Sequence, residues 1–325
     1  RDHWVAQQYL PSSLQGQVFY QPSDQGYEAD IQTQVARRRE AQLAGLVEQN
    51  LEAMMPEALT NGPKYLQQDR RLQRATSELG AQLGEVRDHI FNRLNPQRHH
   101  VLLDLNASTG LLTWEAIRQV PEGGVYSCAH TAKAANALIE QSALFDELAR
   151  PGVVSVEDSE WLSAIVAISS DMTFDGIVGR NALMANSDKP GAIEQIRALL
   201  GPSGKLMLAE SVPSLAQRLS ALLPQAELAP ELREQLVVAE SHLFSNPDDP
   251  MVNWDIADLQ QMFEQAGLNC EIEVSTFETE VLITSALLAR WLGKGGKYCD
   301  RLTTQGLTAD DLTHKRTYFS QQLQN

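Results

Sequence analysis

The sequence predicts an α/β fold: a doubly wound, mostly parallel seven-strand sheet preceded by a helical region. Three observations support this prediction. From Val101 to Leu208, short apolar runs of strand length alternate with helical patterns, which is typical of a parallel sheet with helices on both faces. Two later runs, 270–274 and 281–287, have no helix between them, which predicts one antiparallel edge strand. Before residue 95, leucines and valines recur at helical spacing.

The chain begins with an arm that cannot form a regular helix. Residues 1–30 contain Pro11 and Pro22 together with the aromatic residues Trp4, Tyr9, Phe19, Tyr20 and Tyr27. We expect this extended aromatic arm to pack on residues 30–95 or to mediate self-association into a homo-oligomer, because exposed aromatics leave apolar area in water. Residues 31–95 form a helical linker region, which Asn61-Gly62-Pro63 breaks into two helices.

The predicted sheet domain covers residues 96–288. Its expected strands before the closing pair are 101–105, 125–129, 152–156, 174–178 and 205–209. The expected helices are 111–120, 132–148, 159–168, 191–200, 214–223 and 255–266. Residues 201–204 are expected as a turn. Residues 224–250 are rich in Glu, Pro and Asp, so we expect them to lie outside the sheet, and residues 289–325 are a polar tail with weak helical character.

Composition narrows the class of protein. Hydrophobic residues make up 43% of the chain, enough to bury a core. The three cysteines lie far apart without C-x-x-C spacing, so we expect neither a disulfide scaffold nor a cysteine zinc site, and the pattern suits the reducing cytoplasm. No apolar run approaches the roughly 20 residues of a membrane helix.

The net charge of −16 is unevenly distributed along the chain. Residues 101–325 hold 15 Lys and Arg against 30 Asp and Glu. A duplex-binding surface needs cations to neutralise phosphates, so this part is not expected to bind nucleic acid directly. The strongest basic run, Arg37-Arg38-Arg39, is interpreted as a solvated helix face.

The loop after the first predicted strand is the first candidate ligand site, because open parallel sheets bind ligands beyond the carboxyl ends of their strands. Asp104 ends that strand and can accept hydrogen bonds from loop amides or reach a ligand amine through water. Ala107, Ser108 and Gly110 are small, so a ligand can approach the backbone, and the start of the next helix favours a carboxylate. A tight turn that holds no ligand explains the same residues equally well.

Five motifs in order resemble the class I S-adenosylmethionine-dependent methyltransferases, which have a Rossmann-like fold. Asp104 to Gly110 resembles their D-x-G-x-G-x-G loop, and Val156 to Leu162 resembles the end of their third strand. The segments 174–178, 199–206 and 254–267 resemble the fourth strand, the turn into the fifth, and the helix before the sixth. The resemblance implies S-adenosylmethionine as cofactor. It implies a cofactor site made of Asp104, Asn106, Ala107, Ser108, Gly110, His130, Asp158, Ser159 and Asn181.

The sequence departs from that family at places that matter for activity. Asn106 and Ser108 replace two of the three loop glycines, and we expect Asn106 to stand in for the first because asparagine adopts positive φ more easily than most residues. The acid expected after the second strand, which would hold the ribose, is missing. His130 stands near its place, and a histidine cannot make the paired acceptor contact of a carboxylate. No convincing general base is found, so no catalytic residue is assigned.

A second resemblance concerns residues 3–28. The runs 3–11, 14–16, 19–22 and 26–28 resemble the carboxyl end of the replication-associated recombination AAA+ ATPases, the family that includes the Werner-helicase-interacting ATPases. The resemblance implies that the chain is the downstream part of a fusion whose ATPase module is its partner in the same polypeptide. It also implies that the ATP site lies upstream.

Two functions from different classes stay open. In the first, the chain is a methyltransferase domain of a replication and recombination ATPase fusion, with an unknown acceptor and with catalysis by alignment. In the second, it is a catalytically inactive methyltransferase-fold module for protein interaction or assembly at the replication fork. We expect weak S-adenosylmethionine binding or none, because of the departures described above.

Overall fold

In the computed structural model, the structure describes residues 22–23, 25–52, 63–143, 145–156, 160–222, 230–278, 303 and 308. The chain divides into two compact units. The first comprises Arg1–Val47, Arg70–Ser211 and Ala257–Glu280, and the second comprises Glu48–Asp69, Val212–Ile256 and Val281–Asn325. Most of the predicted arm (residues 1–21), the predicted strand 281–287 and nearly all of the predicted tail lie outside the described residues.

Two helices form the predicted helical region, α1 (Gly26–Glu52) and α2 (Pro63–Leu94). Pro63 of the predicted break is the first residue of α2, and Asn61 and Gly62 lie outside the described residues. Just before α1, the backbone N–H and the hydroxyl of Ser23 both donate to Glu28 Oε2, at 2.9 and 2.7 Å, which ties the chain that enters the helix to its first turn. The two helices cross closely, because a Cβ added at Gly80 would lie 3.1 Å from the Ala41 carbonyl oxygen.

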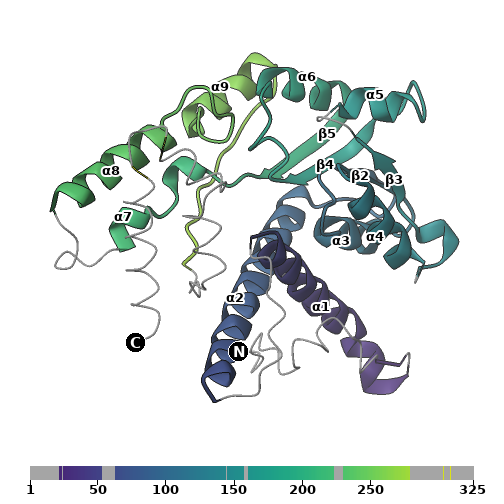
Figure 1. Ribbon diagram of the computed structural model, residues 1–325. Coiled ribbons are helices and arrows are strands. Elements are labelled where there is room, and N and C mark those ends of the chain that lie inside the picture. The colour runs from purple at the N-terminus through teal and green to yellow at the C-terminus, as the bar shows by residue number, and fades with distance from the viewer. Residues whose placement is uncertain are drawn as a thin grey trace. The chain divides into compact units, whose positions relative to one another are not determined.

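The sheet unit contains five described strands, all paired in parallel. They are β1 (Val101–Asp104), β2 (Gly124–Ala129), β3 (Gly152–Ser155), β4 (Phe174–Arg180) and β5 (Leu200–Ala209). Their order is β3-β2-β1-β4-β5, so the chain builds outward from β1 to β3 and then crosses back to β4 (Figure 1). The α/β class with a parallel sheet is confirmed, with five strands in the described residues instead of the predicted seven.

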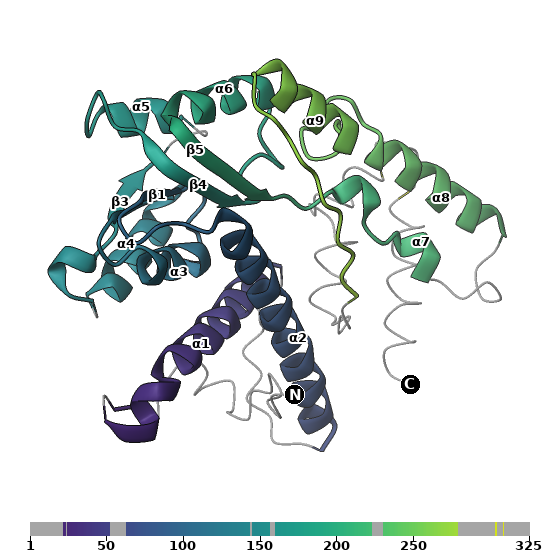
Figure 2. The same cartoon turned by 180° about the vertical axis from the view of Figure 1, so that it is seen from behind.

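Helices cover both faces of this sheet, with α3 and α4 on one face and α5 and α6 on the other (Figures 1 and 2). Their bounds are α3 (Leu111–Gln119), α4 (Ala132–Ser142), α5 (Trp161–Val166), α6 (Lys189–Leu199) and α9 (Ile256–Gln265). Neighbouring residues of a strand point to opposite faces. Accordingly, Leu102 packs with α2, α3 and α4, while Leu103 packs with α5, α6 and α9. Burial on both faces explains the continuous apolar strands of the sequence.

Several predicted elements differ in the structure. Residues 270–274 are not a strand in the structure, and the run predicted to pair with them, 281–287, lies outside the described residues. Residues 201–204 bulge within β5, since Phe174 pairs with Leu200 while Gly176 pairs with Lys205. Helix α4 ends at Ser142, well before the predicted end, and the hydroxyl of Ser142 donates to the Ile139 carbonyl at 2.7 Å.

The second unit contains α7 (Leu219–Leu222) and α8 (Pro230–Phe244). The predicted helix 214–223 is reduced to a single 3-10 turn, Pro213–Leu215, followed by the short α7. The backbone N–H of Ser220 donates to Glu240 Oε2 of α8 at 3.1 Å, and the Arg218 guanidinium lies 3.5 Å from the centroid of the Phe244 ring. These contacts tie α7 to α8 within this unit, in a segment that lies outside the sheet as expected.

Candidate functional site

The candidate site lies at the carboxyl edge of the sheet, between β1 and β4. The strand order reverses there, so the loops that leave the two strands diverge to opposite sides and open a crevice, the place where open α/β sheets bind ligands. The loop 105–110 follows β1, and Asp104 at the end of β1 pairs in register with Val178 of β4. The loops after β2 and β5 reach the same edge.

Asp104 is enclosed beneath this edge with 1% exposure. Its Oδ1 accepts from the Asn106 N–H at 3.2 Å, and its Oδ2 accepts from the Thr113 hydroxyl at 2.8 Å. The Thr113 oxygen lies 2.9 Å from the Ser127 hydroxyl, which extends the network to β2. Burial raises the pKa of Asp104 to about 6, and the hydrogen bonds from Thr113 and Asn106 oppose that rise. Asp104 therefore fixes the loop from inside rather than facing solvent.

The loop 105–110 closes tightly against its neighbours. The Asn106 side-chain amide donates to the Arg180 carbonyl at 2.9 Å, and the Ala107 N–H donates to the Cys128 carbonyl at 2.9 Å. Gly110 caps α3 with φ +72°, and a Cβ there would lie 2.4 Å from Trp114 Nε1, so only glycine fits. Asn106 does not have positive φ, contrary to the prediction, because its side chain links two loops instead of turning the chain.

His130 follows β2 and bends back onto the β1 loop. Its Nε2 lies 2.9 Å from the Leu105 carbonyl oxygen, and because a carbonyl only accepts, Nε2 carries the proton and donates. The Trp161 indole N–H donates to the same oxygen at 3.0 Å, and the two rings meet edge to face. A neutral imidazole in this tautomer has one acceptor left, Nδ1, for a ligand hydroxyl.

The loop after β4 is held by the residues that follow β5. Asn181 has φ +51°, and its Oδ1 accepts from the Ser211 N–H at 2.8 Å. The two oxygens of Glu210 accept from the backbone N–H groups of the next three residues, 182, 183 and 184, at 2.8, 3.1 and 2.8 Å. Burial raises the pKa of Glu210 to about 7, and these three amides and the Lys189 charge oppose the rise.

The structure thus brings most of the predicted site together. Asp104, Asn106, Ala107, Ser108, Gly110, His130 and Asn181 meet at one edge, whereas Asp158 and Ser159 lie outside the described residues. Sequence reasoning missed Thr113, Trp161 and Glu210. For Glu210 a signal existed, because it directly follows the predicted strand 205–209 and the rule that selected Asp104 selects it too. Thr113 and Trp161 lie inside or at the start of predicted helices, where nothing marks their partners.

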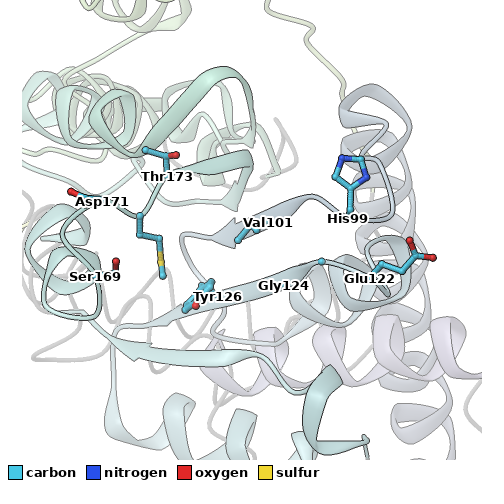
Figure 3. A pocket seen from close by; sticks show the side chains of 10 residues that line it. His99, Val101, Glu122, Gly124, Tyr126, Ser169, Asp171 and Thr173 are labelled. Carbon is cyan, nitrogen blue, oxygen red and sulfur yellow. The ribbon is translucent and has the colours of Figure 1, made fainter.

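A pocket of about 520 Å³ lies at the opposite edge of the sheet. Figure 3 shows Val101 and Gly124, the first residues of β1 and β2, beside Thr173 and Asp171, which precede β4. It is thus remote from the loop 105–110. Among the residues that the structure describes, no three His, Cys, Asp or Glu side chains are grouped to hold a metal ion. In the same part of the chain, no helix has the length and hydropathy to span a membrane.

Comparison with known proteins gives only distant likenesses. No protein-family model and no curated protein matches the sequence. Among solved structures, the glycopeptide N-methyltransferase MtfA is 21% identical over 42% of this chain, with a TM-score of 0.33, and this chain spans 57% of its length. A putative methyltransferase from Bacillus halodurans is 14% identical, with 69% of this chain and 80% of that chain covered and a TM-score of 0.42. The YcgJ protein from Bacillus subtilis is 14% identical, with coverages of 71% and 81% and a TM-score of 0.42. At these values none of the likenesses assigns a family, a ligand or a reaction to this chain.

Proposed function

We propose that the sheet unit is a methyltransferase-like domain that binds S-adenosylmethionine at the carboxyl edge of β1 and β4. The observation that carries the proposal is a pair of backbone amides, those of Ser108 and Thr109, for which the described part of the structure provides no acceptor. They precede α3 at the reversal of strand order, where the helix dipole favours a carboxylate. The carboxylate of the cofactor's methionine end can accept from both amides.

The residues present suit the methionine end better than the ribose end. Ser108 is exposed, and Gly110 keeps the loop close to α3, so the backbone can be approached. At the ribose end His130 offers one acceptor, Nδ1, where a carboxylate would offer two. The loss of one charge-assisted hydrogen bond costs about 1.5–3 kcal/mol, or about one to two decades of affinity. Asp158 and Ser159 are proposed for the adenine on the sequence resemblance alone.

The chemistry of such a site is mostly alignment. When bound, S-adenosylmethionine supplies a methyl group on a sulfonium. This chain's residues would hold and orient it: the Ser108 and Thr109 amides directly, and Asp104, Asn106 and Asn181 by fixing the loops. Because methyl transfer is an in-line displacement that depends on position, the absence of an assigned base is compatible with activity.

A second candidate function is a methyltransferase-fold module without turnover, used for protein interaction or assembly. One observation favours it. Asp104 already accepts from its own loop and from Thr113 of α3, and the side chains of Asn106 and Asn181 already bond to neighbouring segments, so the edge is held together without a ligand. In this alternative these bonds stabilise a surface, and the edge takes no cofactor.

Calorimetric titration of the full chain with S-adenosylmethionine tests the proposal. We expect weak saturable binding that Gly110→Ala abolishes, because the new methyl would meet the Trp114 indole and displace the loop. Gly267→Ala is the matched control. Gly267 also has positive φ, so alanine carries a similar backbone strain of about 1–2 kcal/mol, but nothing lies within 4 Å of the added methyl.

The outcomes separate the two candidates. Binding that is lost in Gly110→Ala and kept in Gly267→Ala supports the cofactor site. If the wild-type chain gives no binding heat at millimolar S-adenosylmethionine, the second candidate function, a methyltransferase-fold module without turnover, is favoured. Equal binding by Gly110→Ala and wild type would show that the loop 105–110 is not the site.

On the residue match at 3–28 alone, we further propose that this domain works in the cytoplasm with an upstream AAA+ ATPase module of the same polypeptide, in DNA replication and recombination. The test is an antibody raised against the sheet unit and used on extracts of the source cells. The expected result is a polypeptide longer than this chain that also cross-links to a photoreactive ATP analogue. A band of this chain's own length without ATP cross-linking would end the fusion proposal.

A further inference from the structure

Six charged side chains from three helices form an ion-pair cluster on one side of α3. Its members are Arg37 and Glu40 of α1, Arg87 and Asp88 of α2, and Glu115 and Arg118 of α3. Arg37 donates to Glu115 Oε2 at 3.0 Å and to Asp88 Oδ1 at 2.7 Å. Arg118 donates to both oxygens of Glu40 and to Glu115 Oε2. The cluster therefore joins α1 and α2 to a helix of the sheet unit, and Arg37 does not lie on the solvated face that the sequence predicts.

Glu115 is the buried centre of the cluster, with its side chain 2% exposed. Burial by itself would raise the pKa of this carboxyl, but hydrogen bonds from Gln119 and Arg118 and the charges of Arg118 and Arg37 hold it below its ordinary value. Glu115 is therefore ionised when it is enclosed. An ionised carboxylate in this place depends on its cationic partners, because a buried charge left without them is strongly unfavourable.

An apolar contact extends this connection to the candidate loop. Leu111, the first residue of α3, packs with Ala41 and Ala44 of α1 and with Leu83 of α2. Leu111 follows Gly110 directly, so it is three residues from Ser108, whose amide carries the proposed function. The contacts of the helical pair with α3 thus include its first residue and, one turn later, Glu115.

We propose that α1 and α2 position the candidate loop through these two contacts, with Glu115 as the positioning residue. The helical pair is then a working part of the ligand site, and a displacement of α1 from α3 loosens the turn that presents the Ser108 and Thr109 amides. The consequence for affinity rests on the proposed function, whereas the coupling between α1 and the loop does not.

Hydrogen exchange measured residue by residue on the full chain tests the coupling. The variants are Glu40→Gln on α1 and Asp88→Asn on α2, which remove cluster contacts without altering the loop or α3. Asp88 is 44% exposed, so its variant is expected to fold even if Glu40→Gln does not. Glu194→Gln is the matched control, since it breaks an exposed pair with Arg197 at 3.4 Å within α6.

In both cluster variants we expect the amides of residues 108–113 to exchange about tenfold faster, with the core strands β1 and β4 unchanged and the control like wild type. Faster exchange in α1 with residues 108–113 unchanged would overturn the proposal, and so would equal acceleration of the loop and the core strands. S-adenosylmethionine titration of the same variants separates the two ideas. If the cluster variants speed exchange at residues 108–113 but the wild-type chain binds no S-adenosylmethionine, the result supports the coupling and contradicts the proposed function.

Discussion

The buried carboxyl of Asp104 makes the stability of the sheet unit depend on pH. Its carboxyl is 1% exposed, and burial raises its pKa from 3.8 to about 6. Because the folded-state pKa lies above the unfolded-state value, the folded chain favours the protonated form. The corresponding stability is fully present below about pH 4 and is lost as the pH rises through about 6, and it amounts to about 3 kcal/mol.

The variant Asp104→Asn is therefore expected to be more stable than wild type at pH 7. A carboxamide carries no charge into the core, its oxygen can accept from the Asn106 N–H, and its nitrogen can donate to the Thr113 oxygen, whose proton then goes to Ser127. Urea unfolding should show a gain of about 1–3 kcal/mol at pH 7 that disappears near pH 4. A stability difference that is the same at both pH values would contradict this account.

At the residue scale, the sequence locates polar residues at the carboxyl edge of the sheet but does not identify their hydrogen-bond partners. Asp104 could be located because a strand end fixes its position, and its expected loop-amide contact is present at Asn106. Thr113 and Ser127 could not be identified as its partners, because hydrogen bonds across a helix and two strands leave no spacing pattern in the chain. The positive φ expected at Asn106 belongs to Asn181 instead.

At the scale of elements, the start of β2 is held against the residue before β1. A Cβ added at Gly123 would lie 1.9 Å from the His100 carbonyl oxygen, a backbone atom that cannot move aside cheaply. The same carbonyl accepts from the Gly124 N–H at 3.2 Å, next to the paired residues Val101 and Gly124. The two strands can therefore start in register only if residue 123 has no side chain.

We expect Gly123→Ala to destabilise the chain by about 2 kcal/mol or more, because the overpacked contact is with backbone. Gly124→Ala is the matched control one residue away. Its added methyl would meet Val101 Cγ1 at 3.8 Å, an ordinary contact, so a change of less than about 1 kcal/mol is expected. Thermal unfolding of both variants measures the difference, and equal losses would show that the His100 contact is not the cause.

The elements that the sequence predicts well are those whose own residues determine them. The five strands of the parallel sheet are apolar runs, and Gly267, two residues after the last residue of α9, has φ +75°, the conformation that commonly follows a helix end. Residues 270–274 show that a strand also depends on a distant partner: they are not a strand in the structure, their predicted partner 281–287 lies outside the described residues, and Glu271 and Glu273 pair through their side chains with Arg93 of α2. The sequence predicts a turn at 201–204, where the structure has the bulge of β5, because a bulge is defined by the pairing with β4.

At the scale of the whole chain, the helical region and the sheet domain are separate segments in the sequence but belong to one unit over most of their length. Arg37 and Glu115 are 78 residues apart, as are Glu40 and Arg118, so no local pattern reveals that they pair. Arg37 of the basic run 37–39 therefore has a structural role, because it pairs with Asp88 of α2 and Glu115 of α3.

The aromatic arm gives the last prediction, and the structure sets where it should be cut. Because Ser23 is hydrogen-bonded to Glu28 in the first turn of α1, a deletion that removes only residues 1–21 keeps this contact and the whole helix in the shortened chain. Trp4, Tyr9, Phe19 and Tyr20 expose large apolar area unless something covers them, so their removal is expected to change the oligomeric state or raise solubility. Light scattering over a range of concentrations measures both. A variant with all four of these aromatics replaced by serine is the control, because it has the full chain length. If the aromatics cause association, the deletion and the serine variant should change the oligomeric state or the solubility in the same way. No change in either variant would make residues 1–21 a dispensable extension.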